Sequence, residues 1–320
     1  MKNLIVSIVI LIVGGQLVAC TNAEQSTNSD KEQKLTIYTT IYPVQYALER
    51  IGGDTVSVET VLPPGVDVHT YEPTTKIMTD VAKSDAFIYL GSGMEGFADS
   101  MADALSSHDL TLVELGRHEA LFHMENIATN NEDNPSHHHD TDGHNHGEHD
   151  PHVWLDPLRM IEISSLLRDT LTELNPSKTN YYTNNFNLVK DDLIDLDESY
   201  TEALDNQTNK KILVSHAAYG YWEDRYGLEQ LSIHGLSSSN EPSQKELTEI
   251  IDQAETYELD YIIFEQNSSN RISEIIQEHL QAKTLIIHNL SVLMEEDIAA
   301  NEDYLSLMKK NLSVLHQATE

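Results

Sequence analysis

Short apolar segments alternate with longer amphipathic segments along the chain after residue 34, and this alternation is the strongest constraint on the fold. Apolar runs at 35–39 and 56–62 flank an amphipathic stretch at 43–52, and the same order continues beyond them. Strands that alternate with helices are typical of a parallel sheet with helices on both faces. The sequence therefore predicts an α/β fold.

The alternation is interrupted once, in the middle of the chain. Residues 157–174 predict a helix, Asn175-Pro176 ends it, and a longer amphipathic helix continues to about residue 204 with no strand between them. A long helix between two β/α halves is a natural connector. We therefore expect an N-terminal lobe at 35–174, a linking helix at 175–206 and a C-terminal lobe at 207–320.

The first 34 residues have no pattern of a folded element. Lys2 precedes an apolar run at 4–13 that is too short to span a bilayer, which is typical of a signal peptide at 1–20. The segment Leu17-Val18-Ala19-Cys20 has the form of a lipobox, so we expect Cys20 to carry a lipid; the alternative is an ordinary secretory signal with an incidental cysteine. Residues 21–34 are polar and predict a flexible tether.

The chain is strongly acidic, with 53 Asp and Glu against 19 Lys and Arg, a formal charge of −34. Binding to a nucleic acid backbone needs clustered Lys and Arg, so this charge argues against a nucleic acid partner. An acidic surface suits a soluble extracytoplasmic protein and attracts cations weakly. For most of these residues, solubility alone is an equally good interpretation.

A run rich in histidine and acid occupies residues 132–150 of the expected N-terminal lobe. No apolar residue occurs from His137 to His152, so the run cannot form part of a core. Neutral imidazole is the commonest zinc ligand, which favours a loop that collects metal weakly over an affinity tag or a plain linker. The histidines of this loop are His137, His138, His139, His144, His146 and His149.

Three further histidines lie in stiff, distinctive segments: His69 in PPGVDVHTYEP, His152 in DPHVWLDP and His216 in LVSHAAYGYW. Each alone is more often structural, but zinc sites commonly combine three histidines with a fourth position. His69 and His216, like Glu265, follow predicted strands, and ligands of open α/β sheets bind at the carboxyl ends of strands. We therefore predict a metal site in the cleft between the lobes, with His234 and His288 as weaker candidates.

The segment Gly91-Ser92-Gly93-Met94-Glu95-Gly96 matches the dinucleotide-binding pattern G-x-G-x-x-G. It follows a predicted strand, but it does not belong to the first β/α unit, and a protein outside the cytoplasm meets little NAD. We interpret it as a tight turn between a strand and a helix.

The ordered set PPGVDVHTYEP, GSGMEGF, a His-rich acidic loop, DPHVWLDP, VSHAAYGYW followed by RYGL, and GLSSSNEPS resembles the zinc-binding solute-binding lipoproteins of bacterial ABC importers (the ZnuA/AdcA type, cluster A-I). The resemblance covers essentially the whole mature chain. It implies two α/β lobes with mostly parallel sheets, flanked by helices and joined by one long rigid helix. It also implies Zn²⁺ held in the interlobe cleft by His69, His152 and His216, and delivery to a membrane permease driven by a cytoplasmic ATPase.

One segment departs from that family's pattern. Close relatives commonly carry Asn-Pro-Leu-Glu or Asn-Leu-Glu in the last β/α turn, and this Glu completes the site. Here the segment reads His288-Asn289-Leu290-Ser291, and a serine hydroxyl is a poor zinc ligand. The fourth position is therefore open to water, Glu265 or Glu295. The alternative role for Glu265 is to orient a histidine or the water without binding the metal.

From these residues we expect an extracytoplasmic, lipid-anchored zinc-binding protein that is not an enzyme. Three neutral imidazoles favour zinc over manganese, and protons should compete with the metal in the acid range, near the unperturbed histidine pKa of about 6.5. One alternative is a secreted zinc hydrolase, but the sequence has no HExxH motif and Glu265 is the only candidate base. The other is an adhesin or metal buffer that binds manganese or another metal.

Overall fold

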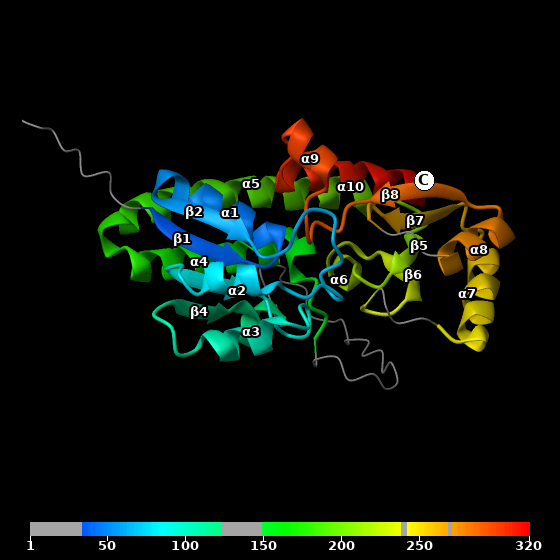
Figure 1. Cartoon of the computed structure of the whole chain (residues 1–320). Coiled ribbons are helices and arrows are strands. Elements are labelled where there is room, and N and C mark those ends of the chain that lie inside the picture. The colour runs from blue at the N-terminus through cyan, green and yellow to red at the C-terminus, as the bar shows by residue number, and fades with distance from the viewer. Residues whose placement is uncertain (1–33, 123–148, 238–241, 268–270) are drawn as a thin grey trace, which may run out of the picture. The chain divides into compact units, whose positions relative to one another are not determined.

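The computed structural model describes residues 34–122, 149–237, 242–267 and 271–320 (Figure 1). Residues 34–320 form one compact unit that contains two β-sheets. Cys20, the tether and the loop histidines other than His149 lie outside the described residues, so the predictions for them stay predictions. None of the described helices is both long and apolar enough to cross a membrane.

The elements up to the linking helix alternate between strand and helix as the sequence predicts. They are β1 (Leu35–Thr39), α1 (Tyr42–Gly52), β2 (Val56–Thr60), α2 (Thr75–Val81), β3 (Ala86–Tyr89), α3 (Ala98–Leu105), β4 (Thr111–Glu114), α4 (Pro157–Leu174) and α5 (Thr179–Asp205).

The elements after it follow the same alternation. They are β5 (Lys211–His216), α6 (Gly220–Tyr226), β6 (Glu229–His234), α7 (Gln244–Thr256), β7 (Tyr261–Glu265), α8 (Arg271–Leu280), β8 (Lys283–Ile287), α9 (Glu295–Ala300) and α10 (Tyr304–Thr319).

Each lobe is built around a four-stranded parallel sheet, and the two sheets have the same topology. The strand order is β2-β1-β3-β4 in the N-terminal lobe and β6-β5-β7-β8 in the C-terminal lobe. All four residues of the inner strand β3 are buried, as expected for a parallel strand with both faces covered. In both sheets the strand order reverses beside the first strand, which places a ligand-binding edge at the carboxyl ends of β1 and β5.

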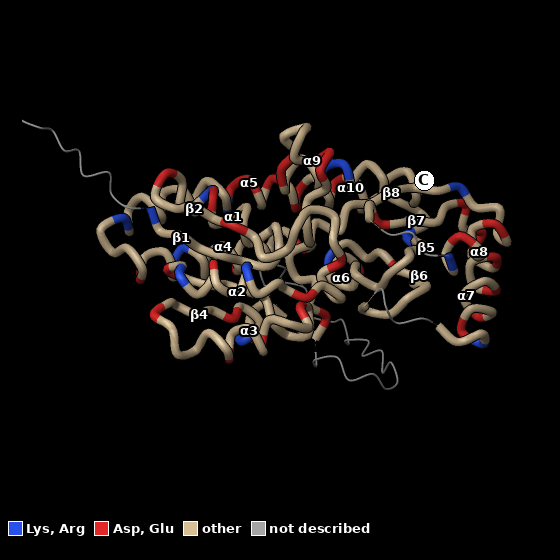
Figure 2. The backbone as a smooth tube through the Cα atoms, viewed as in Figure 1, with Lys and Arg blue, Asp and Glu red and all other residues tan. Residues whose placement is uncertain are grey.

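The predicted linking helix is confirmed as α5, which packs against α1 and α4 of the N-terminal lobe and against α6 and α10 of the C-terminal lobe. Its apolar face recurs at helical spacing, so one stripe is buried along its whole length. The buried residues of this stripe are Tyr182, Phe186, Val189, Leu193, Leu196, Tyr200 and Leu204. The other face is polar, and Asp and Glu outnumber Lys and Arg along the elements of both lobes (Figure 2).

Strand β6 extends to His234, because its pairing with β5 places His216 opposite His234. Helix α9, at Glu295–Ala300, is too short and too acidic to show a periodic pattern in the sequence.

Candidate metal centre

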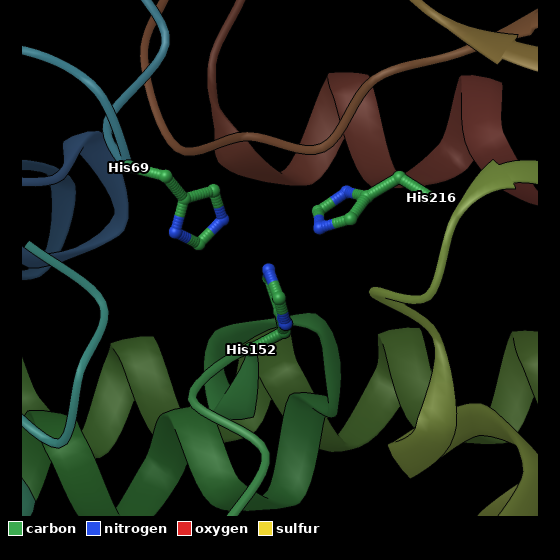
Figure 3. Close-up of side chains that lie close together, drawn as sticks. All are labelled: His69, His152 and His216. Carbon is green, nitrogen blue, oxygen red and sulfur yellow. The ribbon is translucent and has the colours of Figure 1, made fainter. Parts of the chain in front are cut away.

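Three histidines from different parts of the chain converge between the lobes (Figure 3). His69 lies in the loop after β2, His152 precedes the short helical turn at Val153–Leu155, and His216 is the last residue of β5. One ring nitrogen from each lies within 4.8 Å of the others, and within the described ranges no other group of three His, Cys, Asp or Glu residues does so. The structure thus brings together the three residues predicted as metal ligands.

The Nδ1 atom of each ring is held by an oxygen that can only accept a hydrogen bond. His69 Nδ1 donates to the Met94 carbonyl (3.1 Å), His152 Nδ1 to the Asp150 carboxylate (2.7 Å) and His216 Nδ1 to the Glu265 carboxylate (2.7 Å). In a neutral ring held in this way the hydrogen is on Nδ1, and Nε2 is the atom that faces the other rings. Anchors of this kind orient metal-binding histidines and make them more basic.

The Nε2 atom of His152 is the clearest sign that the three histidines suit a metal ion. His152 is 1% exposed, and its Nε2 has no hydrogen-bond partner among the described residues. A buried polar nitrogen without a partner costs about 1–3 kcal/mol, so such atoms are rare unless something binds them. Zinc accepts neutral imidazole nitrogens readily, and Nε2 of His152 faces the other two rings (Figure 3).

His69 is the neutral member of the group. Burial, and then the neighbouring His152 and His216 rings, lower the pKa of His69 to about 4. Its Nε2 is therefore unprotonated at neutral pH.

His216 differs because both of its nitrogens face oxygen atoms. Besides the bond to Glu265, Nε2 lies 2.8 Å from the Leu236 carbonyl, so both nitrogens donate and the ring is an imidazolium. Burial lowers the pKa of His216, but Glu265 and the Leu236 carbonyl outweigh burial and raise it to about 9. A metal that binds Nε2 must displace this proton and the bond to Leu236.

Glu265 lies behind His216 and is fixed by neighbours. Its carboxylate accepts hydrogen bonds from His216 Nδ1, from Asn289 Nδ2 at 2.7 Å and from the Tyr219 hydroxyl at 3.2 Å. Burial raises the pKa of Glu265, but His216 and then the bond from Asn289 lower it to about 2. Glu265 is thus an ionised anchor for His216.

The candidates for the fourth position lie apart from the converging nitrogens. Neither Glu265 nor Glu295 belongs to the group of converging ligand atoms, and Glu295 is exposed at the start of α9. The Ser291 hydroxyl donates to Asn289 Oδ1 at 2.9 Å. Within the described residues the converging candidate ligands are therefore the three histidines.

The DPHVWLDP segment that carries His152 is fixed by contacts with both lobes. Buried aromatic donors of the C-terminal lobe bind its backbone carbonyls, and its own Trp154 donates to that lobe. The bonds are Tyr221 Oη to Asp150 O (2.5 Å), Trp222 Nε1 to Leu155 O (2.6 Å), Tyr304 Oη to Trp154 O (2.6 Å) and Trp154 Nε1 to Asn289 O (2.8 Å).

The weaker candidates lie elsewhere. His234 Nδ1 donates to the Ser215 carbonyl at 2.7 Å, and His288 Nε2 donates to Asp297 at 3.0 Å. His149 stacks on the Phe122 ring, with 4.6 Å between centroids. None of them belongs to the converging group.

Sequence reasoning considered Glu265 as a group that orients a histidine but missed the other anchors, although one signal was present. The pattern Asp-x-His occurs at Asp67–His69 and at Asp150–His152, and in both the Asp side chain accepts the backbone N–H of the His (2.8 and 3.0 Å). Such Asx turns fix the backbone locally. Met94, Asn289 and Tyr219 reach the site through long-range contacts that leave no local pattern.

A cavity of about 220 Å³ adjoins the histidines. Its lining combines residues of both lobes, namely His69, Ser92, Gly93, Gly96, Pro151, Leu236 and Ser237. The cavity is thus lined both by His69 and by Leu236, whose carbonyl lies 2.8 Å from His216 Nε2.

Comparison with known proteins agrees with this chemistry. A family model described as "Zinc-uptake complex component A periplasmic" matches residues 37–318. The zinc-binding lipoprotein AdcA of Streptococcus pneumoniae (strain R6) is 34% identical over 304 residues, which are 95% of this chain and 58% of the relative. The high-affinity zinc uptake system protein ZnuA of Bacillus subtilis is 29% identical over 300 residues, 93% of this chain and 92% of the relative.

The chain thus spans 58% of the length of the first curated relatives it matches. Among solved structures, the Zn(II)-bound ZnuA-like domain of Streptococcus pneumoniae AdcA aligns with a TM-score of 0.71 and 32% identity, over 89% of this chain and 99% of that domain.

Proposed function

Since the chain belongs to the family of the periplasmic zinc-uptake complex component A, we propose that it captures Zn²⁺ outside the cytoplasm and delivers it to the permease of an ABC importer. The observation that carries this proposal is the group of three histidines whose Nδ1 atoms are anchored and whose Nε2 atoms converge. Three imidazoles without a carboxylate in the group favour zinc over manganese.

Binding in this proposal is an exchange of a proton for a metal ion at His216. His69 and His152 present Nε2 atoms, while His216 gives up the proton that it shares with the Leu236 carbonyl. Glu265 stays ionised behind His216 and offsets part of the charge of the ion. Water takes the fourth position, as in other three-histidine zinc sites.

Release uses the same exchange in reverse. When His216 is protonated again, Nε2 regains the Leu236 carbonyl as its partner, so the nitrogen is satisfied with or without metal. The empty state of this half of the site is therefore stable, which suits a protein that must give its zinc to a permease.

The position of the protein in the cell is part of the proposal. A lipid on Cys20 anchors it to the membrane, residues 21–34 act as the tether, and the His-rich loop at 132–150 gathers zinc weakly near the site. These roles rest on the sequence patterns.

A zinc hydrolase is less consistent with the site. Hydrolysis at an open zinc position needs a general base within reach of the bound water. Glu265, the candidate base, is instead engaged by His216, Asn289 and Tyr219 behind the ring of His216.

Competition with a chelator tests the proposal on the purified chain without residues 1–20. His69→Ala, His152→Ala and His216→Ala should each weaken zinc binding strongly, and His279→Ala, an exposed histidine of α8, should not. Zinc-limited growth of a deletion strain should be restored by the parent gene but not by the three variants. Parental zinc affinity in all three variants would show that the ligands are wrong.

A further inference from the structure

The turn that resembles a dinucleotide-binding motif contacts the metal centre. The Met94 carbonyl in this turn accepts the hydrogen bond from His69 Nδ1. Ser92, Gly93 and Gly96 line the cavity beside His69. The Gly91–Gly96 turn therefore lies beside His69 and orients its ring through the Met94 carbonyl.

The backbone of this turn is in an unfavourable conformation. Gly91, Ser92 and Gly93 have φ values of +74°, +52° and +81°, so three consecutive residues are left-handed. Glycine adopts such values at little cost, but Ser92 does not. A Cβ atom at Gly91 would also lie 2.7 Å from a carboxylate oxygen of Glu114. A turn of this kind keeps one geometry only where its surroundings fix it.

Glu95 fixes this turn from the inside. Its side chain is buried, and its carboxylate accepts hydrogen bonds from the backbone N–H of Leu90 (3.1 Å) and of Gly91 (2.9 Å) and from the Thr40 hydroxyl. These bonds tie the turn to the end of β3 and to the residue after β1.

The contacts of Glu95 exclude a direct role at the metal. Both carboxylate oxygens are engaged by these donors, and Glu95 does not belong to the converging group. The two carboxylate oxygens accept both backbone N–H groups at once, whereas an amide offers only one acceptor oxygen.

We propose that Glu95 is a positioning residue for zinc binding: its buried carboxylate fixes the Gly91–Gly96 turn so that the Met94 carbonyl holds His69 Nδ1–H and directs Nε2 to the ion. This inference rests on the proposed function of His69 as a zinc ligand. The dinucleotide-like pattern thus serves to orient a metal ligand.

Glu95→Gln is the most direct variant. A glutamine has one acceptor oxygen where the carboxylate has two, so Leu90 or Gly91 loses the acceptor of its N–H. We expect the turn to shift, the His69 ring to lose its fixed tautomer, and zinc to dissociate about 10-fold faster, the lower end of the effects known for outer partners of metal ligands.

Thr40→Val provides a second variant, because it removes the hydroxyl donor to Glu95 and keeps the shape of the side chain. Thr40→Ser keeps the hydroxyl and should behave like the parent. Ser84→Ala is the matched control, since Ser84 is buried in the same lobe and its hydroxyl donates to the Val81 carbonyl at 2.7 Å, away from the turn.

The test combines long-range ¹H–¹⁵N NMR of the imidazole nitrogens in the metal-free chain with zinc dissociation into excess chelator. Glu95→Gln and Thr40→Val should reduce the Nδ1–H population of His69 and speed dissociation, whereas Thr40→Ser and Ser84→Ala should do neither. The inference fails if Glu95→Gln lowers only the melting temperature while the His69 tautomer and the dissociation rate stay parental. Should Glu95→Gln not fold, Thr40→Val decides by the same two readouts.

His69→Ala separates this inference from the proposed function. If His69→Ala leaves zinc dissociation unchanged, the proposed function of His69 is wrong. If His69→Ala weakens binding and Glu95→Gln does not, the inference about Glu95 alone is wrong.

Discussion

His69 and His216, one from each lobe, differ in the group that holds the ring and in the direction of their pKa shift. His69 of the N-terminal lobe is held by the uncharged Met94 carbonyl and has a pKa lowered to about 4. His216 of the C-terminal lobe is held by the Glu265 carboxylate and has a pKa raised to about 9. At neutral pH the first half of the site is ready for metal and the second half holds a proton.

Burial does not explain this difference, because it lowers the pKa of both histidines. The anchors explain it, since an opposite charge in contact favours the protonated ring and a carbonyl supplies no full charge. The carboxylate of Glu265 is therefore the group that favours the protonated ring of His216.

The largest expected effect is the loss of either ligand, and proton release distinguishes the two. His69→Ala and His216→Ala should each weaken zinc binding by more than the roughly 10–100-fold typical of outer partners. His69→Ala should still release about one proton per zinc at pH 7, while His216→Ala should release almost none. Calorimetry in buffers of different ionisation enthalpy measures this. Equal proton release in both variants would contradict the prediction that the released proton comes from His216.

The next effect is the pH dependence of the parent. Protons and zinc compete for His216 Nε2, so affinity should rise with pH by about tenfold per unit, or about 100-fold between pH 6.5 and 8.5. It should level off above pH 9, where the metal-free ring is already neutral. Chelator competition at fixed ionic strength checks this. An affinity that is constant across this window would show that His216 is not held as an imidazolium.

Glu265→Gln should have an effect whose size depends on pH. The variant loses the carboxylate that supports His216, which should weaken binding about 10–100-fold at pH 9.5. At pH 7 the loss should be smaller, because the pKa of His216 falls without Glu265 and zinc no longer has to displace a proton. Glu229→Gln, at the opposite end of the same sheet, is the control. Equal weakening at both pH values would exclude proton exchange at His216.

The sequence predicts which histidines converge better than it predicts the groups that hold them. His69 and His216 were found because they follow strands, and His152 because prolines and an apolar patch flank it; the structure brings all three together. The two-lobed parallel fold and the helix α5 are confirmed, since their patterns are local and periodic.

Contacts between distant segments could not be predicted in the same way. Glu265 is 49 residues from His216 and Met94 is 25 residues from His69, so no spacing rule connects them. The unperturbed histidine pKa of about 6.5 describes an imidazole in water and contains none of these contacts. Glu265 and the Leu236 carbonyl raise the pKa of His216 to about 9, whereas burial and the neighbouring His152 and His216 rings lower that of His69 to about 4.

The smallest expected effect concerns the His-rich loop. Deleting residues 132–148 should change the affinity of the tight site by less than about twofold, which corresponds to a few tenths of a kcal/mol. The reason is that the three proposed ligands and their anchors Met94, Asp150 and Glu265 lie outside the deleted range.

The number of zinc ions bound per chain should fall towards one in the deletion variant, since weak sites on the loop are lost. The matched control keeps the length of the loop and replaces its five histidines in this range by asparagine. Calorimetric titration of both variants separates the loss of ligands from the loss of length. Because the proton exchanged at the tight site belongs to His216, both variants should still release about one proton for the first zinc bound at pH 7. Loss of the tight site in either variant would mean that the loop supplies one of the ligands of that site. The three histidines outside the loop would then not be its complete set of protein ligands.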